Sequence, residues 1–124
     1  MRTISTTDAP EAIGPYSQAV AAGGWVFTSG IIGLTPSGEM AGTSAKGQAE
    51  QIFSNLRAVL SAGGCDLSDV IKVTVYMKNL NDFSIVNEIY ARHFGEHRPA
   101  RSTVEVAALP KGALIELDAV AFTG

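Results

Sequence analysis

The sequence predicts an α+β domain in which a mixed β-sheet is covered on one face by two helices. Two segments, residues 44–62 and 82–94, carry apolar side chains at helical spacing. A third segment, residues 70–78, alternates apolar and polar side chains as a strand with one buried face does. Further strand-like segments precede the first helix and follow the second. This order is typical of helices gathered on one side of a sheet.

The composition indicates a single globular domain over residues 1–124. Hydrophobic residues make up 46% of the chain and charged residues 17%. The net charge of -3 argues against a general affinity for nucleic acid or for anionic membranes. No stretch approaches the roughly 18 apolar residues of a membrane span, and the N-terminus lacks a signal-peptide core. We therefore expect a cytoplasmic protein, with no nucleic-acid or membrane partner. Because a domain of this size has little room for a deep pocket, a site shared between subunits is a sensible expectation.

The first half of the chain is predicted to begin with two strands. These span residues 16–22 and 25–29, and the Gly23–Gly24 pair between them signals a two-residue hairpin. Residues 30–42 are rich in turn-forming residues, so we expect an irregular connection there.

Both predicted helices have recognisable ends. Thr43 or Ser44 can cap the first helix, and Gly63–Gly64 can end it. Asn81 or Asp82 can cap the second, and Gly95 can stop it. The apolar stripe of the first helix consists of Ala45, Ala49, Ile52, Phe53, Leu56, Val59 and Leu60.

Three strands are predicted in the second half, at residues 70–78, 101–107 and 114–122, with a turn at 109–112. In the first of them, the face expected to be buried carries Ile71, Val73, Val75 and Met77. The sheet face without helices needs a cover, and oligomerisation is the simplest explanation.

Two polar residues interrupt apolar patterns. Asn87 shares a helix face with three aromatic residues, namely Phe83, Tyr90 and Phe94. It is either a cleft residue or a structural amide that holds a neighbouring loop. Glu116 shares a strand face with Asp118 and with apolar residues. It is either a partly buried carboxylate that directs a water, or part of a solvated face.

Two further residues stand at strand starts. Arg101 offers a planar fork that pairs with a carboxylate, and its structural alternative is a salt bridge to Glu105 or Glu116. Tyr16 follows the Gly14–Pro15 bend, and its ring can belong to the core or to a pocket wall.

Other chemistries find little support. The segment 29–33 does not match a dinucleotide-binding loop. His93 and His97 have no third ligand nearby, so no metal site is expected. Cys65 has no basic neighbour, which makes it an inert loop residue, and a lone cysteine forms no intramolecular disulfide. Any chemistry must therefore use Arg, Glu, Tyr, Ser, backbone amides and water.

Several motifs spread along the chain form one recognisable pattern. They lie at residues 12–18, 28–30, 80–83 with Asn87, 99–106, 109–112 and 115–116. Together they resemble the RidA/YjgF family of reactive-intermediate deaminases, over essentially the whole chain. The resemblance implies a chorismate-mutase-like fold and a homotrimer. Its three sheets would form a central barrel, with helices outside and three clefts between subunits.

The resemblance also implies an activity, the hydrolysis of 2-imino acids or their enamine tautomers to 2-oxo acids and ammonia. Pyridoxal-phosphate-dependent dehydratases release these imines, and the family itself uses no cofactor. By this resemblance, Arg101 would hold the substrate carboxylate and Glu116 would position the attacking water. The remaining cleft positions would be Tyr16, Ser29, Gly30, Ile31 and Asn87.

The chain departs from the best-known deaminases at three places. Ile31–Gly33 stands where they carry Gln-Ile-Pro, the loop at residues 95–98 is short, and Thr103 replaces a frequent cysteine. These differences bear on substrate range. Two other functions remain open: a small-metabolite binder of the same fold, and an endoribonuclease or translation inhibitor.

Overall fold

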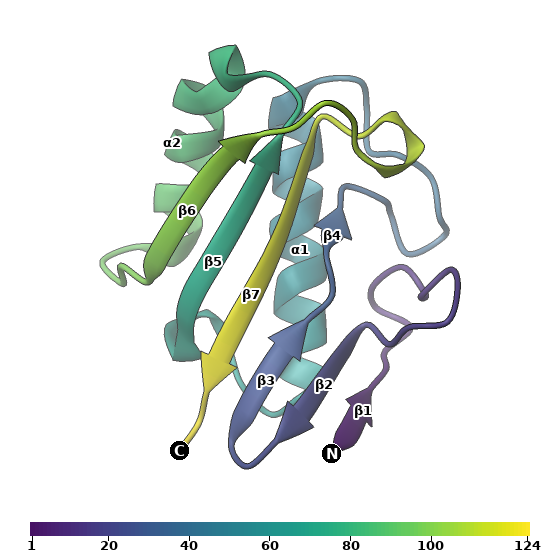
Figure 1. The fold of residues 1–124 in the computed structure, drawn as a ribbon, viewed down its shortest axis with the longest axis vertical. Helices are drawn as coiled ribbons and strands as arrows, with labels where there is room; N and C mark the ends of the chain where they lie inside the picture. The colour runs from purple at the N-terminus through teal and green to yellow at the C-terminus, as the bar shows by residue number, and fades with distance from the viewer.

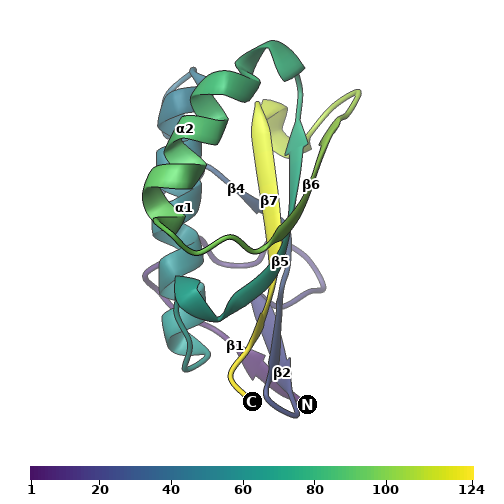
Figure 2. The ribbon, with the colours of Figure 1, turned by 90° about the vertical axis from the view of Figure 1, so that its left-hand side faces the viewer.

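Seven strands form one mixed sheet, and two α-helices lie against one of its faces. The computed structural model describes all 124 residues. The strand order is β1-β2-β3-β7-β5-β6, and β4 pairs with β7 beside this path. The β5–β6 pair is parallel, whereas the other pairs are antiparallel. Figure 1 shows the sheet in front of the helices, and Figure 2 shows both helices on the same side. The predicted fold class is thus confirmed.

The regular elements alternate along the chain as predicted, with two extra short strands. They are β1 (Arg2–Ile4), β2 (Ala19–Ala22), β3 (Trp25–Thr28), β4 (Ile31–Ile32), α1 (Ala45–Ala62), β5 (Val70–Met77), α2 (Phe83–Phe94), β6 (Ala100–Glu105) and β7 (Ile115–Phe122). Three 3-10 turns connect them: η1 (Leu67–Asp69), η2 (Leu80–Asp82) and η3 (Pro110–Gly112).

The predicted ends of α1 and the hairpin are confirmed. Ser44 caps α1, its hydroxyl accepting a hydrogen bond from the backbone N–H of Gly47 at 3.1 Å. The helix ends at Gly63. Gly23 and Gly24 have φ angles of 56° and 86°, which glycine adopts without steric cost and which a tight hairpin between β2 and β3 requires.

Several predicted boundaries were wrong. Residues 16–18 form a loop instead of the start of β2, and the irregular segment 30–42 contains β4. β1 was not predicted, and β6 ends at Glu105. Ile71 was placed on the buried face but is 42% exposed. The register shifts between Val70 and Lys72, and an extra residue at such a bulge reverses which face the next side chain occupies.

The hydrophobic core fills the space between the sheet and the helices. Its largest fully buried side chains include Phe53, Ile52, Leu56, Leu60, Met77, Ile89, Ile115 and Leu117. In β7 the residues from Ile115 to Ala121 alternate between buried and half-buried, as their pattern predicted. Glu116 and Asp118 therefore point to the face that no helix covers.

Two buried amides of α1 hold the neighbouring chain in place. Asn55 donates hydrogen bonds from Nδ2 to the carbonyl oxygens of Leu34 (2.8 Å) and Ile32 (3.3 Å). Gln48 accepts a hydrogen bond from the backbone N–H of Leu114 at 2.8 Å. These bonds join α1 to backbone groups at the ends of two strands. They fix β4 and the entry to β7, the segments that carry the candidate site.

The uncovered face of the sheet presents aromatic side chains at one end. Trp25, Phe27 and Phe122 are all exposed, and the rings of Trp25 and Phe122 lie 4.6 Å apart between centroids. An exposed apolar patch of this kind marks an interaction surface. Neither helix is long and apolar enough to cross a membrane.

Candidate functional site

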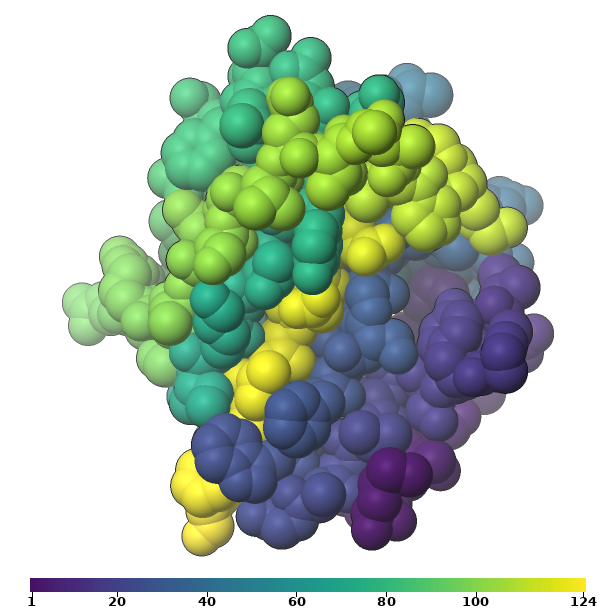
Figure 3. All heavy atoms as spheres, in the orientation of Figure 1, coloured from purple at the N-terminus to yellow at the C-terminus, as the bar shows by residue number.

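A pocket of about 310 Å³ lies between the N-terminal loop, β4, the start of β7 and the η3 turn. Figure 3 shows the surface hollowed beside the N-terminal loop, on the side of the sheet that faces the viewer. Five sequence-predicted site residues line it together: Tyr16, Ser29, Gly30, Ile31 and Glu116. They come from three separate segments, which the pairing of β4 with β7 brings together.

The wall that carries Tyr16 is a loop with little regular structure, and one side chain organises it. The Oε1 atom of Gln18 accepts a hydrogen bond from the Thr6 N–H at 2.7 Å, and its Nε2 atom donates to the Pro10 carbonyl at 2.7 Å. The hydroxyl of Tyr16 accepts from the N–H of Ile13 at 3.2 Å, which holds its exposed ring against the loop. Tyr16 is therefore pocket wall rather than core.

Glu116 supplies the carboxylate of the pocket. Burial raises its pKa above the ordinary value of 4.5, and the neighbouring Asp118 raises this pKa further. The carboxylate has no hydrogen bond or ion pair within the chain. Asp118 instead accepts a hydrogen bond from the hydroxyl of Tyr76 at 3.0 Å. Glu116 is thus a half-buried acceptor whose lone pairs remain available to a ligand or a water.

Gly30 makes room for this carboxylate. A Cβ atom at position 30 would stand only 2.8 Å from the Cδ atom of Glu116, closer than real Cβ contacts come. Ser29, next to it, donates a hydrogen bond from its hydroxyl to the Ser17 carbonyl at 2.6 Å. Its hydroxyl therefore ties β3 to the loop, and its oxygen keeps acceptor capacity for the pocket.

Arg101 and Asn87 lie elsewhere. Nη1 of Arg101 donates a hydrogen bond to Oδ1 of Asn87 at 2.9 Å. Arg101 pairs with Val73 on β5, whose side chain is buried under the helices, whereas Glu116 pairs with Tyr76 on the open face. Paired residues point to the same side of a sheet, so Arg101 and Glu116 project from opposite faces. The two main predicted site residues do not meet within one chain.

The structural alternatives predicted for Arg101 and Asn87 do not form within the chain. The ion pairs of the chain all involve Glu50, and Arg101 makes no salt bridge with Glu105 or Glu116. Glu105 instead accepts a hydrogen bond from the backbone N–H of Leu80 at 2.8 Å. Asn87 does not hold a loop.

The face of α2 that carries Phe83, Asn87, Tyr90 and Phe94 is only partly buried. The buried residues of that helix are Val86, Ile89, Tyr90 and Phe94, while Phe83 and Asn87 are exposed. The buried direction of the helix is therefore turned away from Asn87, toward the neighbouring α1.

Sequence reasoning missed two residues of the pocket. Gln18 acts through four hydrogen bonds to backbone groups, which its amide chemistry permits but its position in the sequence does not reveal. Lys111 lines the pocket from η3 and is the only non-glycine residue with positive φ, at 56°. Backbone strain of this kind gathers at functional sites, and the Lys111–Gly112 turn signal was the available clue.

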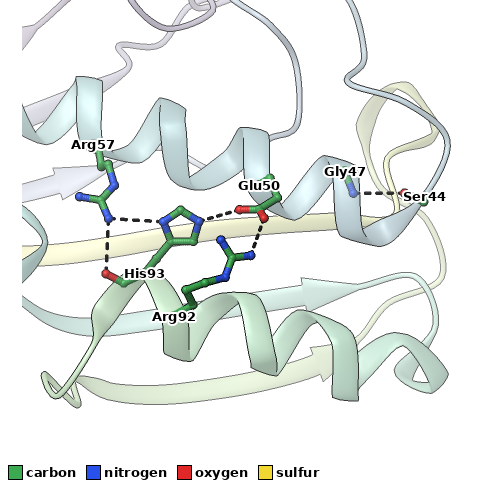
Figure 4. Close-up of polar contacts among 6 residues, drawn as sticks. All are labelled: Ser44, Gly47, Glu50, Arg57, Arg92 and His93. Atoms are coloured by element: carbon green, nitrogen blue, oxygen red, sulfur yellow. Dashed lines mark hydrogen bonds and ion pairs between the residues drawn. The ribbon is translucent and has the colours of Figure 1, made fainter.

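A second polar cluster joins the helices on the outer surface and takes no part in the pocket. Glu50 accepts from Arg92 (2.5 Å) and pairs with Nε2 of His93 (2.7 Å), as Figure 4 shows. Arg57 contacts His93 from the other side. The hydrogen bond from Arg92, followed by the one with His93, lowers the pKa of the Glu50 carboxyl. The cluster ties α1 to α2.

No group of three His, Cys, Asp or Glu side chains has the arrangement of a metal site. His97 contacts the Val70 carbonyl at 2.6 Å, so both histidines have structural partners. Cys65 is buried, and its burial raises the pKa of the thiol. A raised pKa disfavours the reactive thiolate.

Comparison with known proteins gives one consistent result. The family model described as Endoribonuclease L-PSP matches residues 6–123. The human 2-iminobutanoate/2-iminopropanoate deaminase is 48% identical over 124 residues, which cover 99% of this chain and 90% of that protein. Other relatives carry only the name RutC family protein.

Solved structures agree over the full length. The YjgF gene product of Escherichia coli is 44% identical, with a TM-score of 0.95, and 100% of each chain is covered. Escherichia coli TdcF, solved with bound serine, is 42% identical with the same TM-score and the same coverage. With a family model that spans nearly the whole chain and relatives at this identity, the chain belongs to the RidA/YjgF family.

Proposed function

We propose that this protein hydrolyses reactive 2-imino acids to 2-oxo acids and ammonia in a cleft formed by two copies of the chain. One observation carries the proposal. Glu116 is a half-buried carboxylate with no partner in its own chain, and Arg101 offers its guanidinium on the opposite face of the sheet. Each chain thus holds two separate halves of a site that suits a small anionic, electrophilic substrate. The deaminase name of the human relative and the serine bound to TdcF agree with such a substrate.

The chemistry follows from these groups. Arg101 of one copy binds the substrate carboxylate through two parallel N–H···O bonds. Glu116 of the neighbouring copy accepts a proton from a water as that water attacks C2 of the protonated imine. A C–O bond forms, and the C=N double bond becomes a single bond. The carbinolamine nitrogen then takes up the proton held by Glu116, and the C–N bond breaks to release ammonia. The C2 hydroxyl gives its proton back to Glu116 as it becomes the 2-oxo group. Water is the only co-reactant.

The raised pKa of Glu116 suits this task, because a base is most effective when its pKa lies closer to the working pH. Positioning supplies much of the remaining rate enhancement, since a protonated imine carbon is already electrophilic. Tyr16 and the backbone of Gly30 and Ile31 close the pocket around the reacting atoms.

Assembly of the site requires a second copy on the uncovered face of the sheet. The exposed Trp25, Phe27 and Phe122 supply apolar surface for such a contact. We propose a homotrimer, in which each cleft takes Arg101 from one chain and the Glu116 pocket from the next. Light scattering at micromolar concentration is expected to give three times 12.9 kDa, and a mass of 12.9 kDa would contradict both the trimer and the shared cleft.

The direct test is a deaminase assay on 2-iminobutanoate generated in situ by an amino-acid oxidase or a dehydratase. The protein is expected to accelerate the release of 2-oxobutanoate and ammonia in the presence of a metal chelator. If the rate equals that of the uncatalysed reaction while the protein binds 2-oxobutanoate, the protein is a metabolite binder and not a deaminase.

A second candidate function comes from the description of the family model, Endoribonuclease L-PSP. The chain is acidic overall, with a net charge of -3, which disfavours binding to a polyanion. Cleavage of single-stranded RNA by the same preparation, lost in Arg101→Ala, would favour this alternative over imine hydrolysis.

A further inference from the structure

Three residues on one face of α2 lie against the guanidinium of Arg101. The residues involved are Phe83, Asn87 and Tyr90, which lie four and three positions apart and so share a helix face. The Cζ atom of Arg101 lies 4.6 Å from the ring centroid of Tyr90 and 5.6 Å from that of Phe83. Between the two rings, Asn87 accepts the hydrogen bond from Nη1 at 2.9 Å.

The Tyr90 side of this arrangement is rigid. Tyr90 is only 7% exposed, and its ring packs against Phe94 at 4.7 Å and edge-on against Phe53 at 5.9 Å between centroids. Its hydroxyl is buried and has no hydrogen-bond partner. The ring, and not the hydroxyl, is therefore the part of Tyr90 that acts on Arg101. Phe83 is more exposed, at 38%.

We propose that Phe83, Asn87 and Tyr90 form a positioning cradle, which sets the rotation of the Arg101 guanidinium and leaves its remaining N–H groups directed at a carboxylate. This inference rests on the proposed function. It reassigns Asn87 from a residue that contacts substrate to one that acts through Arg101. The guanidinium has five N–H donors in a fixed plane, and the bond to Asn87 is the one side-chain bond that it makes. Fixing one corner of a planar fork fixes the direction of the others.

The chemistry of the cradle is suited to this task. Asn87 is neutral, so it orients the cation without competing with a carboxylate ligand, as an aspartate would. The aromatic faces attract the cation without neutralising it. An exposed arginine with no such contacts would lose side-chain entropy each time it binds a ligand, and a cradle removes part of that cost beforehand.

The test measures carboxylate binding separately from turnover. The probe is 2-oxobutanoate, the product of the proposed reaction, and its Kd is measured by calorimetry alongside KM and kcat for 2-iminobutanoate. Asn87→Ala is expected to raise Kd and KM by roughly tenfold with a smaller change in kcat. Asn87→Asp is expected to raise them further, because its carboxylate pairs with Arg101. Glu88→Gln, an exposed position of α2 without contact to Arg101, is the matched control.

The rings are tested in parallel. Phe83→Leu and Tyr90→Leu are each expected to raise Kd by roughly two- to fivefold. Tyr90→Phe keeps the ring and is expected to recover most of the loss seen in Tyr90→Leu. Melting temperatures identify any variant that simply unfolds. Tyr90 is buried, so Tyr90→Leu could unfold the protein. Phe83 is partly exposed, so Phe83→Leu is expected to stay folded and still tests the contribution of a ring.

A double-mutant cycle with Arg101→Lys decides the mechanism. If Asn87 acts through the guanidinium, Asn87→Ala raises the Kd for 2-oxobutanoate by less than about twofold in the Arg101→Lys protein. If the two substitutions instead raise Kd independently, so that their fold-changes multiply in the double variant, the cradle is overturned and Asn87 contacts the substrate directly. Wild-type protein that binds no 2-oxobutanoate would also overturn it. Binding that depends on Arg101 and Asn87 without imine turnover would leave the cradle standing and refute the deaminase.

Discussion

The two halves of the proposed site are built by different means. The Glu116 half is positioned by amide side chains that bind backbone groups: Gln18 fastens the loop, and Asn55 and Gln48 hold β4 and the entry to β7. The missing Cβ of Gly30 then leaves room for the carboxylate. The Arg101 half is positioned by side chains of α2, at the edge strand of the sheet. The pocket is therefore preformed with its carboxylate in place, whereas the cation sits on an edge that a neighbouring chain can approach.

The electrostatics of the halves also differ. Glu116 has a like charge nearby and no cation, so its pKa is raised. Arg101 has an amide and two rings nearby and no carboxylate. Each half keeps its charge uncompensated within its own chain. The proposed site between chains would bring these two charges together.

The largest effect is expected from the edge half. Arg101→Ala is predicted to abolish measurable deamination while leaving assembly and melting temperature nearly unchanged, because the guanidinium makes no salt bridge within the chain. Arg101→Lys keeps the charge but lacks the planar fork, so KM is expected to rise. Steady-state kinetics and thermal unfolding check this. An unfolded Arg101→Ala protein would make Arg101 a structural link between β6 and α2.

The pocket half is expected to act on the chemical step. Glu116→Gln removes the charge and keeps the shape, so kcat is predicted to fall roughly 10²–10⁴-fold with a smaller change in KM. Asp118→Asn is the control on the same strand face and should stay close to wild type at neutral pH. If Asp118→Asn is inactive while Glu116→Gln is active, the wrong carboxylate has been assigned.

Mixing the two inactive variants tests whether the halves belong to different chains. When Arg101→Ala and Glu116→Gln proteins are dissociated and reassembled together at equal amounts, about one quarter of the clefts receive both native residues. Activity is predicted to recover to that level. Each variant reassembled alone is the control. A mixture that stays inactive would mean that both residues must come from the same chain.

A smaller effect is expected from the contact beneath Glu116. In Gly30→Ala the new methyl group forces the carboxylate aside, so kcat is predicted to fall roughly 10- to 100-fold. The melting temperature should change little, because φ at Gly30 lies outside the left-handed region and the displaced group ends a flexible side chain. In the Glu116→Gln protein, Gly30→Ala should lower kcat little further. An equal fall in kcat there would mean that Gly30 acts independently of Glu116.

The smallest predicted effect is a shift in pH dependence. Glu116 must be ionised to accept a proton, and its raised pKa places the acidic limb of kcat/KM above 4.5. Asp118→Asn removes a like charge and is expected to move that limb to lower pH. A limb that does not move would exclude Asp118 as a cause.

Stability should change in the same pH window. Because the folded chain binds the Glu116 proton more tightly than the unfolded chain, this group favours folding at low pH. That contribution is lost as pH rises from about 4.5 through the raised pKa. In Asp118→Asn the loss is expected to be smaller, measured by urea unfolding across this range.

The regular elements and their faces were largely readable from the sequence. The alternation in β7 predicted that Glu116 and Asp118 share one face of the strand, and Ser44 and Gly63 predicted the ends of α1. Such signals are local, because side-chain direction in a regular element follows its own period. Ile71 shows the limit: a bulge set by pairing with β7 changed the direction of its side chain.

The sequence by itself determined the element types, the candidate residues and, through its motifs, the family. The tertiary structure decided how those residues are grouped. Whether Arg101 points to the helices or to the open face depends on its parallel register with β5, and the partner of Asn87 depends on how α2 crosses β6. Both are contacts between segments distant in the chain, where many pairings satisfy the same local pattern. Only the packing of the whole chain selects one of them, and it separates Arg101 from Glu116.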